Sequence, residues 1–338
     1  MTPDRKALII QPGAVGDCLL TIPLVRYLRN ERGLNRVDLM GHTQRLQYLQ
    51  NRTEITRVID MERSSLHKLF EDRAETTWDE QDDMVKLFKP YELIITYLFD
   101  PKGLFERNLV NIANMTRPTD IITLPLRPPN VYQGHVTTFY IESFNTQIPD
   151  GSTEITALPW LKIPLISQLE PDPQRGREIL ASHIAADSTN PILLHPGSGG
   201  EAKCWPLENF TELSQSLKHH GLEPIFLLGP AEHDRWDNAK IKSIESQVPV
   251  IKELNLEDAL CLLTACTAYA GNDSGITHLA ASLGLPGVAI FQTQNQNHWT
   301  PLGSRIKLCK TENPTKENWP TTQDALKTLL NSLQNPVA

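Results

Sequence analysis

Residues able to take part in chemistry gather in glycine-containing segments, the first of which is Pro12-Gly-Ala-Val-Gly-Asp17. It follows the apolar run Lys6–Gln11 and precedes apolar residues at helical spacing, which predicts strand, turn and helix. Gly13 and Gly16 permit a tight turn and a close approach to a ligand. A carboxylate at Asp17 can cap the helix or abstract a proton from a bound hydroxyl, and the sequence leaves both interpretations open.

The second segment, His195-Pro-Gly-Ser-Gly-Gly-Glu-Ala-Lys-Cys-Trp-Pro206, lies between a predicted strand and a predicted helix. Its glycine amides, that of Gly199 among them, and the hydroxyl of Ser198 could surround a phosphate, while Lys203 would supply a positive charge. The Gly-Lys-Ser/Thr order of a P-loop is missing. The alternative is an ordinary glycine-rich turn with a solvated lysine.

The third segment, Gly271-Asn-Asp-Ser-Gly-Ile-Thr-His-Leu-Ala-Ala281, again joins a predicted strand to a helix. Asp273, Ser274 and Gly275 would present unpaired amides at a helix N-terminus, where the partial positive charge attracts a diphosphate. His278 falls one turn into this helix and could point to the same place. The alternatives are a packed, hydrogen-bonded histidine and an Asp273 that merely caps the helix.

A further carboxylate, Glu232, follows the predicted strand Glu223–Leu228 and the dipeptide Gly229-Pro230. At the carboxyl edge of a parallel sheet it can accept hydrogen bonds from ribose hydroxyls, although a surface residue at a helix start would look the same. Two glycine-rich strand-to-helix turns in one α/β domain favour a nucleotide site over the simpler alternatives.

The elements that would position these residues alternate between short apolar runs and amphipathic stretches, which is typical of parallel sheets covered by helices on both faces. Further strands are predicted at Arg36–Met40, Arg57–Asp60, Leu93–Leu98, Asp120–Leu124, Pro191–His195, Val248–Ile251, Ala268–Ala270 and Gly287–Ile290, and further helices at Leu207–His220, Asp234–Ser246, Leu256–Ala265 and Ile276–Leu283. Six prolines between Pro149 and Pro191, with Pro171-Asp-Pro173 excluded from a helix interior, predict a boundary near 165–175. We therefore expect an α/β fold with domains at 1–168 and 169–338, and a helix at 322–333 that could pack on either.

Composition excludes several classes of protein. The chain is 40% apolar and carries a formal charge of −8 without a Lys/Arg stripe, which argues against nucleic-acid binding. No apolar run reaches the roughly 18 residues of a membrane span, and Asp4, Arg5 and Lys6 interrupt any signal peptide. The five cysteines lack the spacing of a zinc site, so we expect reduced thiols in a cytoplasmic protein.

Taken together and in this order, the segments resemble glycosyltransferase family 9, the bacterial heptosyltransferases that build the inner core of lipopolysaccharide. The resemblance spans nearly the whole chain. It is carried by Gly16-Asp17 followed by Leu-Leu-Thr-Ile-Pro23, by His195-Pro-Gly-Ser with Lys203-x-Trp-Pro206, by Gly271-Asn-Asp-Ser-Gly-x-x-His278-Leu-Ala-Ala, and by Pro301-Leu-Gly303.

The resemblance implies a GT-B architecture, in which two Rossmann-like, doubly wound domains face each other across a cleft. The N-terminal domain would bind the acceptor and the C-terminal domain a nucleotide sugar. Inversion at the anomeric carbon would use Asp17 as the base, with Gly16 beside it. The implied donor-binding residues are Ser198, Gly199, Lys203, Glu232 (ribose), Leu254 (base), Asp273, Ser274, Gly275 and His278.

Neither a metal nor a cofactor is expected, because the chain has no Asp-x-Asp pair and helix termini with side-chain cations could replace the metal. Departures from the family fall on the acceptor side, at Phe99–Arg107, and at Phe291-Gln292 with the polar run Thr293–His298. Four cations are candidates for meeting an anionic acceptor or are simply solvated, namely Arg63, Lys68, Lys102 and Arg107.

The expected function is therefore an inverting, metal-independent transfer of heptose from ADP-heptose to a lipopolysaccharide-core or other glycan acceptor. A lipid-linked acceptor would fit a peripheral contact with the inner face of the cytoplasmic membrane, and the oligomeric state is open. The alternatives are a non-catalytic nucleotide-sugar sensor of the same fold and a family member with another sugar donor. A nicotinamide-dependent oxidoreductase would need a Gly-x-Gly-x-x-Gly turn, which is absent.

Overall fold

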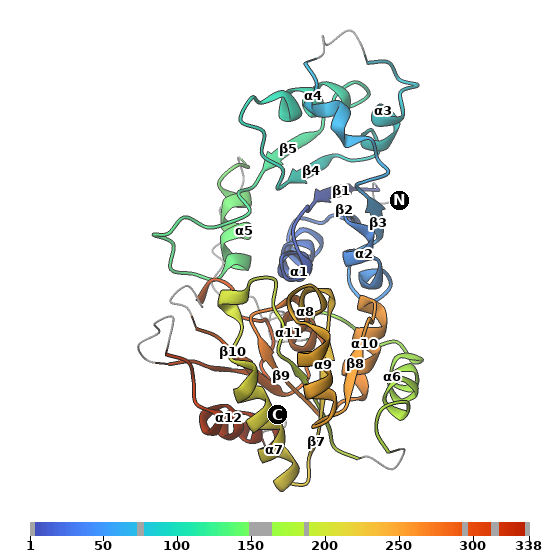
Figure 1. Cartoon of the computed structure of the whole chain (residues 1–338). Coiled ribbons are helices and arrows are strands. Elements are labelled where there is room, and N and C mark those ends of the chain that lie inside the picture. The colour runs from blue at the N-terminus through green and yellow to red at the C-terminus, as the bar shows by residue number, and fades with distance from the viewer. Residues whose placement is uncertain are drawn as a thin grey trace. The chain divides into compact units, whose positions relative to one another are not determined.

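A computed structural model of the chain describes residues 4–72, 78–148, 164–185, 189–292, 297–311 and 318–334. The chain forms two compact units, Met1–Leu158 and Pro159–Ala338 (Figure 1). The division falls at 158/159, whereas the prolines predicted a boundary at 168/169. Among the described residues, no helix combines the length and the hydrophobicity needed to cross a membrane.

The first unit is built on a parallel sheet with the strand order β3-β2-β1-β4-β5. Its strands are β1 (Lys6–Ile10), β2 (Arg36–Gly41), β3 (Arg57–Asp60), β4 (Leu93–Thr96) and β5 (Asp120–Thr123). Its helices are α1 (Val15–Asn30), α2 (Thr43–Leu46), α3 (Asp83–Phe88), α4 (Leu104–Ala113) and α5 (Val136–Asn145), with 3₁₀ turns η1 (Gln47–Leu49) and η2 (Leu66–Phe70). Ala7 to Ile10 are fully buried, as expected for a central strand covered on both faces.

The second unit is built on a parallel sheet with the order β11-β10-β9-β6-β7-β8. Its strands are β6 (Pro191–His195), β7 (Glu223–Leu228), β8 (Val250–Lys252), β9 (Ala268–Asn272), β10 (Gly287–Ile290) and β11 (Ile306–Cys309). Its helices are α6 (Asp172–Ala181), α7 (Leu207–His219), α8 (Pro230–Arg235), α9 (Asn238–Glu245), α10 (Leu256–Ala265), α11 (Gly275–Ser282) and α12 (Thr322–Gln334), with a 3₁₀ turn η5 (Glu201–Lys203).

Three features of the second unit differ from the sequence expectation or complete it. The predicted helix Asp234–Ser246 is two helices, α8 and α9, separated at Trp236–Asp237. Strand β11 was not predicted, and it extends the sheet beyond β10. The C-terminal helix α12 packs within the second unit, against α7, β10 and β11.

The prolines at 171 and 173 start a helix instead of marking a linker. Pro171 is the N-cap of α6 and Pro173 lies in its first turn. Proline is tolerated there because the first N–H groups of a helix have no partner within the helix. Gly176 of α6 lies so close to α10 that an added Cβ would be 2.0 Å from the Cys261 carbonyl, so α6 is packed tightly against the second unit.

Both sheets have the strand order of a Rossmann fold, with the first strand of each unit at its centre. The order reverses between β1 and β4 in the first unit and between β6 and β9 in the second. Ligands of such sheets bind beyond the carboxyl ends of the strands at these switch points. The loops that carry the candidate residues begin there.

Candidate functional site

In the second unit, the two glycine-containing segments leave the sheet side by side. His195 at the end of β6 pairs with Gly271 near the end of β9. The loop after β6 and the turn after β9 therefore start from adjacent strands at the switch point. This is the edge where the sequence placed a nucleotide site.

Asn272, the last residue of β9, ties down both ends of the loop between β6 and α7. Its Nδ2 donates to the Pro196 carbonyl at 2.7 Å, and its Oδ1 accepts from the backbone N–H of Trp205 at 3.0 Å. Asn272 is fully buried, and Trp205 donates its indole N–H to the Pro320 carbonyl at 3.0 Å. Asn272 was not predicted as a site residue, and its one signal in the sequence is its place in the third segment.

Asp273 gathers predicted donor residues from both segments. Its Oδ2 lies 2.6 Å from Lys203 Nζ, and its Oδ1 lies 4.0 Å from His278 Nε2. Its carbonyl accepts a hydrogen bond from Ser198 Oγ at 2.6 Å. Because Ser274 is the N-cap of α11, the alternative that Asp273 merely caps this helix is wrong.

The turn that presents the α11 amides is fixed by buried hydroxyls beneath it. Ser274 Oγ accepts from the Thr277 N–H at 3.3 Å, and Thr277 Oγ1 lies 2.8 Å from Tyr269 OH. An added Cβ at Gly271 would lie 2.1 Å from the same Tyr269 hydroxyl, which explains the glycine there. These hydrogen bonds therefore hold the first turn of α11, which begins at Gly275, in place.

Glu232 is a buried carboxylate and not a surface residue. Its side chain is on α8, where Oε2 accepts from the Gly229 N–H at 2.7 Å. The carboxylate packs against Gly197, where an added Cβ would lie 2.1 Å from Oε1. In the described part of the chain nothing hydrogen-bonds Oε1. A buried acceptor with spare capacity is what a ribose hydroxyl requires.

His195 lies beneath this loop as a buried, neutral side chain. Its Nδ1 donates to the Leu227 carbonyl at 3.0 Å. Burial lowers the pKa of His195 below its usual 6.5, and the nearby charge of Glu232 opposes that shift only in part. The residue therefore joins β6 to β7 under the candidate site.

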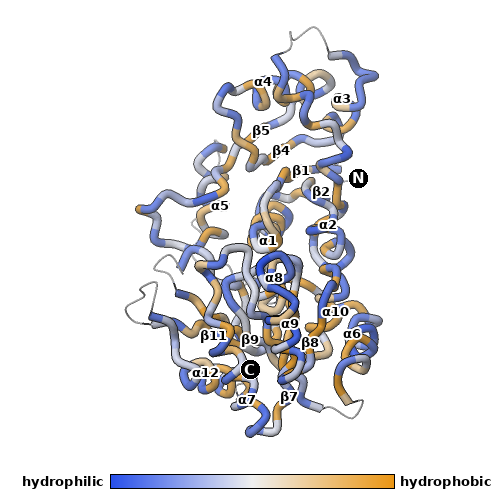
Figure 2. Tube along the Cα trace, viewed as in Figure 1, coloured by the Kyte–Doolittle hydropathy of each residue, from blue (hydrophilic) through white to orange (hydrophobic). Residues whose placement is uncertain are grey.

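Beside Glu232, a small cavity of about 200 Å³ separates the loop from α8 and α9. Arg235 lines it and donates from Nη2 to the Ser198 carbonyl at 2.8 Å. Lys240 Nζ lies 5.0 Å from the centre of the Trp236 ring at the same cavity. The sequence offered no signal for Arg235, because it is one of several polar or charged residues in α8, which is mostly hydrophilic (Figure 2).

The remaining donor candidates lie at the same edge of the sheet but do not all meet. Gly199 lies in the loop with open space where a Cβ would point. Leu254 lies between β8 and α10, two strands from β6, which is a separation of roughly 10 Å. The structure therefore sets Leu254 apart from the residues around Asp273.

In the first unit, Asp17 does cap the helix as one interpretation predicted. It occupies the third position of α1, and its Oδ2 accepts from the Ala14 N–H at 2.8 Å. An added Cβ on Gly13 would lie 2.6 Å from Asp17 Cβ, so that glycine makes room for the carboxylate. Gly16 precedes it within α1. The cap occupies one carboxylate oxygen and is compatible with a catalytic role.

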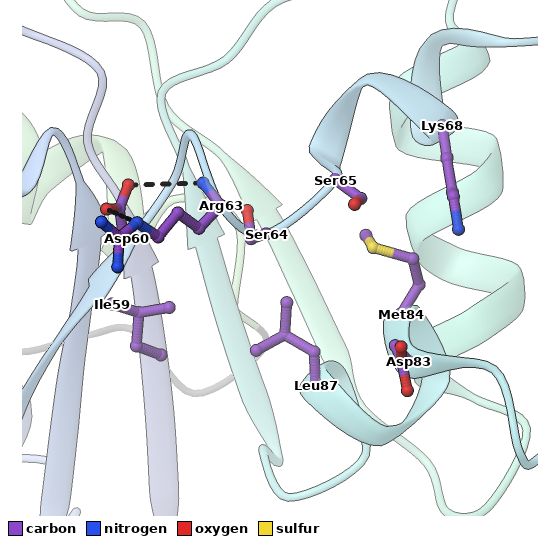
Figure 3. Close-up of a pocket in the computed structure, with 9 residues that line it drawn as sticks. All are labelled: Ile59, Asp60, Arg63, Ser64, Ser65, Lys68, Asp83, Met84 and Leu87. Carbon is purple, nitrogen blue, oxygen red and sulfur yellow. Dashed lines mark hydrogen bonds and ion pairs between the residues drawn. The ribbon is translucent and has the colours of Figure 1, made fainter.

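Arg63 and Lys68 line one cavity of the first unit, with a volume of about 360 Å³ between β3, η2 and α3 (Figure 3). The Arg63 side chain turns back toward Asp60, with Nε 3.5 Å from Oδ2. Ser64 and Ser65 lie between the two cations in Figure 3. The structure thus brings these two candidates to one hollow that also contains hydroxyls.

Lys102 and Arg107 lie apart from this cavity. Lys102 follows β4 in a turn capped by Asp100, which accepts from the backbone N–H groups of Lys102 and Leu104. Arg107 on α4 donates to Asp72 Oδ1 at 2.9 Å. The four cations therefore do not form one basic patch.

Known proteins are similar to this chain over most of its length. The profile of glycosyltransferase family 9 (heptosyltransferase) covers residues 171–328. Lipopolysaccharide heptosyltransferase 2 of Salmonella typhimurium is 25% identical over 323 residues, which are 90% of this chain and 88% of that protein. Residues 171–328 of the second unit match glycosyltransferase family 9, and the chain is similar to a lipopolysaccharide heptosyltransferase over 90% of its length. The predicted resemblance to this family and the prediction of a glycosyltransferase are thereby confirmed.

Solved structures with the same fold cover almost the whole chain. A family 9 glycosyltransferase from Veillonella parvula superposes with a TM-score of 0.73 at 17% identity and covers 99% of both chains. The E. coli ADP-heptose lipopolysaccharide heptosyltransferase II superposes with a TM-score of 0.71 at 20% identity and covers 97% of this chain and 98% of that one. The predicted GT-B architecture of two Rossmann-like domains is confirmed.

Proposed function

We propose that this glycosyltransferase transfers a heptose from ADP-heptose to a sugar of the lipopolysaccharide core. The curated relative in Salmonella is named a lipopolysaccharide heptosyltransferase, and the E. coli structure is that of an ADP-heptose enzyme. Each covers about nine-tenths or more of this chain. The acceptor is thus a glycan, and a lipid-linked one would bring the enzyme to a membrane surface.

The cluster around Asp273 is the observation that carries this proposal. A diphosphate needs cations and amide donors that are already oriented, since these lose little entropy when they bind it. Lys203, Ser198, His278 and the N-terminus of α11 lie together at the switch point. The buried carboxylate of Glu232 would accept hydrogen bonds from the ribose.

We assign the base of the transfer to Asp17. An inverting transfer needs one carboxylate to take the proton of the acceptor hydroxyl while the nucleoside diphosphate leaves. The hydrogen bond from the Ala14 N–H and the packing on Gly13 fix one orientation of the Asp17 side chain. Lys203 and His278 would balance the negative charge that develops on the leaving diphosphate.

We propose further that no metal takes part, because the helix terminus and Lys203 can supply the positive charge. In the described ranges, no three His, Cys, Asp or Glu side chains cluster as a metal site would require. Transfer should then be unchanged in excess EDTA. A loss of activity in EDTA that Mg²⁺ restores would contradict this part of the proposal.

The function is tested by incubating the full chain with a panel of nucleotide sugars and heptose-free lipopolysaccharide core. Mass spectrometry should show a mass increase of one heptose, and NMR of the product should show the inverted anomeric centre. Transfer of another sugar would correct the donor. Binding of a nucleotide sugar that is neither hydrolysed nor transferred to the lipopolysaccharide core would instead indicate a sensing protein.

A further inference from the structure

The loop from Pro196 to Pro206 contains little regular structure, yet it carries Ser198, Gly199 and Lys203. Apart from the 3₁₀ turn η5, its shape depends on what holds it from outside. On one side are the contacts of Asn272 and Asp273, described above. On the other side is α8. The sequence did not predict that this helix takes part in binding the diphosphate.

Two side chains of α8 contact neighbouring residues of this loop. Glu232 packs its carboxylate against Gly197, leaving no space for a Cβ there. Arg235, one turn further along α8, donates from Nη2 to the Ser198 carbonyl at 2.8 Å. Its Nη1 also lies 3.7 Å from Cys204 Sγ near the other end of the loop.

Two different atoms of Ser198 are therefore held, one by Asp273 and the other by Arg235. Its hydroxyl donates toward Asp273 at 2.6 Å, while its carbonyl is turned to Arg235. A trans peptide is planar, with its C=O and the next N–H pointing in opposite directions. Since the chain has no cis peptide among its described residues, the Gly199 N–H must point away from Arg235. The space at Gly199 is open.

From this geometry we infer that Arg235 is a positioning residue of the donor site. By holding the Ser198 carbonyl, its guanidinium keeps the Gly199 amide turned outward as a hydrogen-bond donor for the diphosphate. The inference rests on the proposed function for its ligand, but the hold on the loop is a property of the free protein. Without Arg235 the peptide between Ser198 and Gly199 can rotate, and binding must then select one orientation.

The test compares the wild-type chain with Arg235→Met, which keeps the length of the side chain and removes its donors. Hydrogen exchange of the free protein, followed by mass spectrometry, should become faster in peptides covering residues 196–204. Calorimetry with ADP should show affinity lowered about tenfold, as expected if the Gly199 amide is turned outward in only about a tenth of the free molecules. The KM for the nucleotide sugar should rise by a similar factor, with kcat nearly unchanged.

Controls separate this role from general destabilisation. Arg175→Met removes the same charge from α6, where Arg175 pairs with Asp258 at 2.9 Å, and should alter neither measurement. Arg235→Lys, which can still donate to a carbonyl, should recover part of the ADP affinity. Guanidinium ions at low millimolar concentration should do the same for Arg235→Ala.

The outcomes discriminate the possibilities. Weaker ADP binding with unchanged exchange would mean that Arg235 contacts the ligand directly, which overturns the positioning role. Faster exchange with unchanged ADP affinity would overturn it too, because the orientation of Gly199 would not matter. If wild-type chain binds none of the common nucleoside diphosphates, the proposed function fails, and the exchange comparison still decides whether Arg235 holds the loop.

Discussion

The carboxyl edges of the two sheets have the same topology but are built in different ways. In the second unit, side chains of β9 and α8 donate hydrogen bonds to backbone carbonyls of the loop after β6, and an ion pair joins Lys203 of that loop to Asp273. In the first unit, Asp17 is fixed by its own helix, and Arg63 and Arg107 pair with separate acids. At one edge the contacts converge on a single loop, and at the other they are separate from one another.

This difference fits the tasks that we propose for the two units. A nucleoside diphosphate is a constant ligand, and a site whose parts are already connected loses little freedom on binding it. Glycan acceptors vary, and loops that are held by separate contacts can change one at a time without disturbing the sheet. The first unit then keeps one fixed catalytic group, Asp17, among replaceable cations.

Replacing Asp17 should have the largest effect, and only on transfer. Asp17→Asn keeps an oxygen to accept from Ala14 N–H, so the cap and the fold should survive. Loss of the base should lower kcat about a thousandfold, within the range for general acid–base catalysis. Initial rates with saturating donor and acceptor measure it, together with ADP affinity, which should stay the same.

A matched variant for this prediction is Asp82→Asn, because Asp82 caps α3 by accepting from the Met84 N–H at 2.8 Å. It should leave kcat unchanged. If Asp17→Asn retained turnover near the wild-type rate, Asp17 would be a cap only.

The connected edge should respond in the opposite way, with binding affected before chemistry. Lys203→Met removes the cation that lies 2.6 Å from Asp273 and is half exposed, so it should weaken ADP binding by about tenfold to a hundredfold. Calorimetry measures this, with Lys218→Met on α7 as the control. Equal affinity of Lys203→Met and wild type would remove Lys203 from the donor site.

How far the sequence could go follows the same division between local and connected structure. Buried apolar runs and glycine turns have local signals, so most strands and the segments at Asp17, Lys203 and Ser274 were predicted. The start of α6 was misread because a proline pair also fits a first helical turn. Strand β11 was missed because it has only four residues, of which one, Lys307, is charged and exposed.

Residues that act between distant segments have no such signal. Arg235 lies 37 positions from Ser198, and Asn272 lies 67 from Trp205. Nothing in the spacing of either pair indicates a contact, since the fold alone brings β6, β7 and β9 together. The burial of Glu232 likewise depends on Gly197, which belongs to another strand-to-helix loop.

Two buried asparagines offer a direct comparison of the units. Asn272→Ala leaves the Pro196 carbonyl and the Trp205 N–H without partners, which should cost about 3 kcal/mol of unfolding free energy. Asn108→Ala in the first unit should cost about as much, because Asn108 Nδ2 donates to the carbonyls of Leu69 and Glu71 at 2.8 Å each. Urea unfolding measures both costs.

Of these two variants, Asn272→Ala alone should also weaken ADP binding, since Asn272 holds the donor loop. If Asn108→Ala weakened ADP binding as much, the loss would reflect general destabilisation. The contrast between a connected donor edge and a separate first unit would then fail.

The cations of the first unit should matter less, and for the acceptor alone. The Arg63 side chain is 90% exposed, so removing it with Lys68 should raise the acceptor KM about threefold, as expected for exposed charges. Donor KM should not change. If Lys102→Met raised the acceptor KM more than the double variant Arg63→Ala, Lys68→Met, the acceptor would contact the turn after β4 and not the cavity.

The smallest effect should come from pH, through His195 beneath the connected edge. Because burial lowers the pKa of His195 in the folded state below 6.5, the unfolded chain binds a proton first as pH falls. This contribution to stability is complete above about pH 6.5 and is lost on acidification toward the folded pKa. His195→Asn keeps a donor for the Leu227 carbonyl and cannot titrate, so its melting temperature should fall less than that of wild type between pH 7.5 and pH 5.5. Parallel melting curves for the two proteins would show that His195 is not held neutral, and that the floor of the donor site tolerates a buried charge.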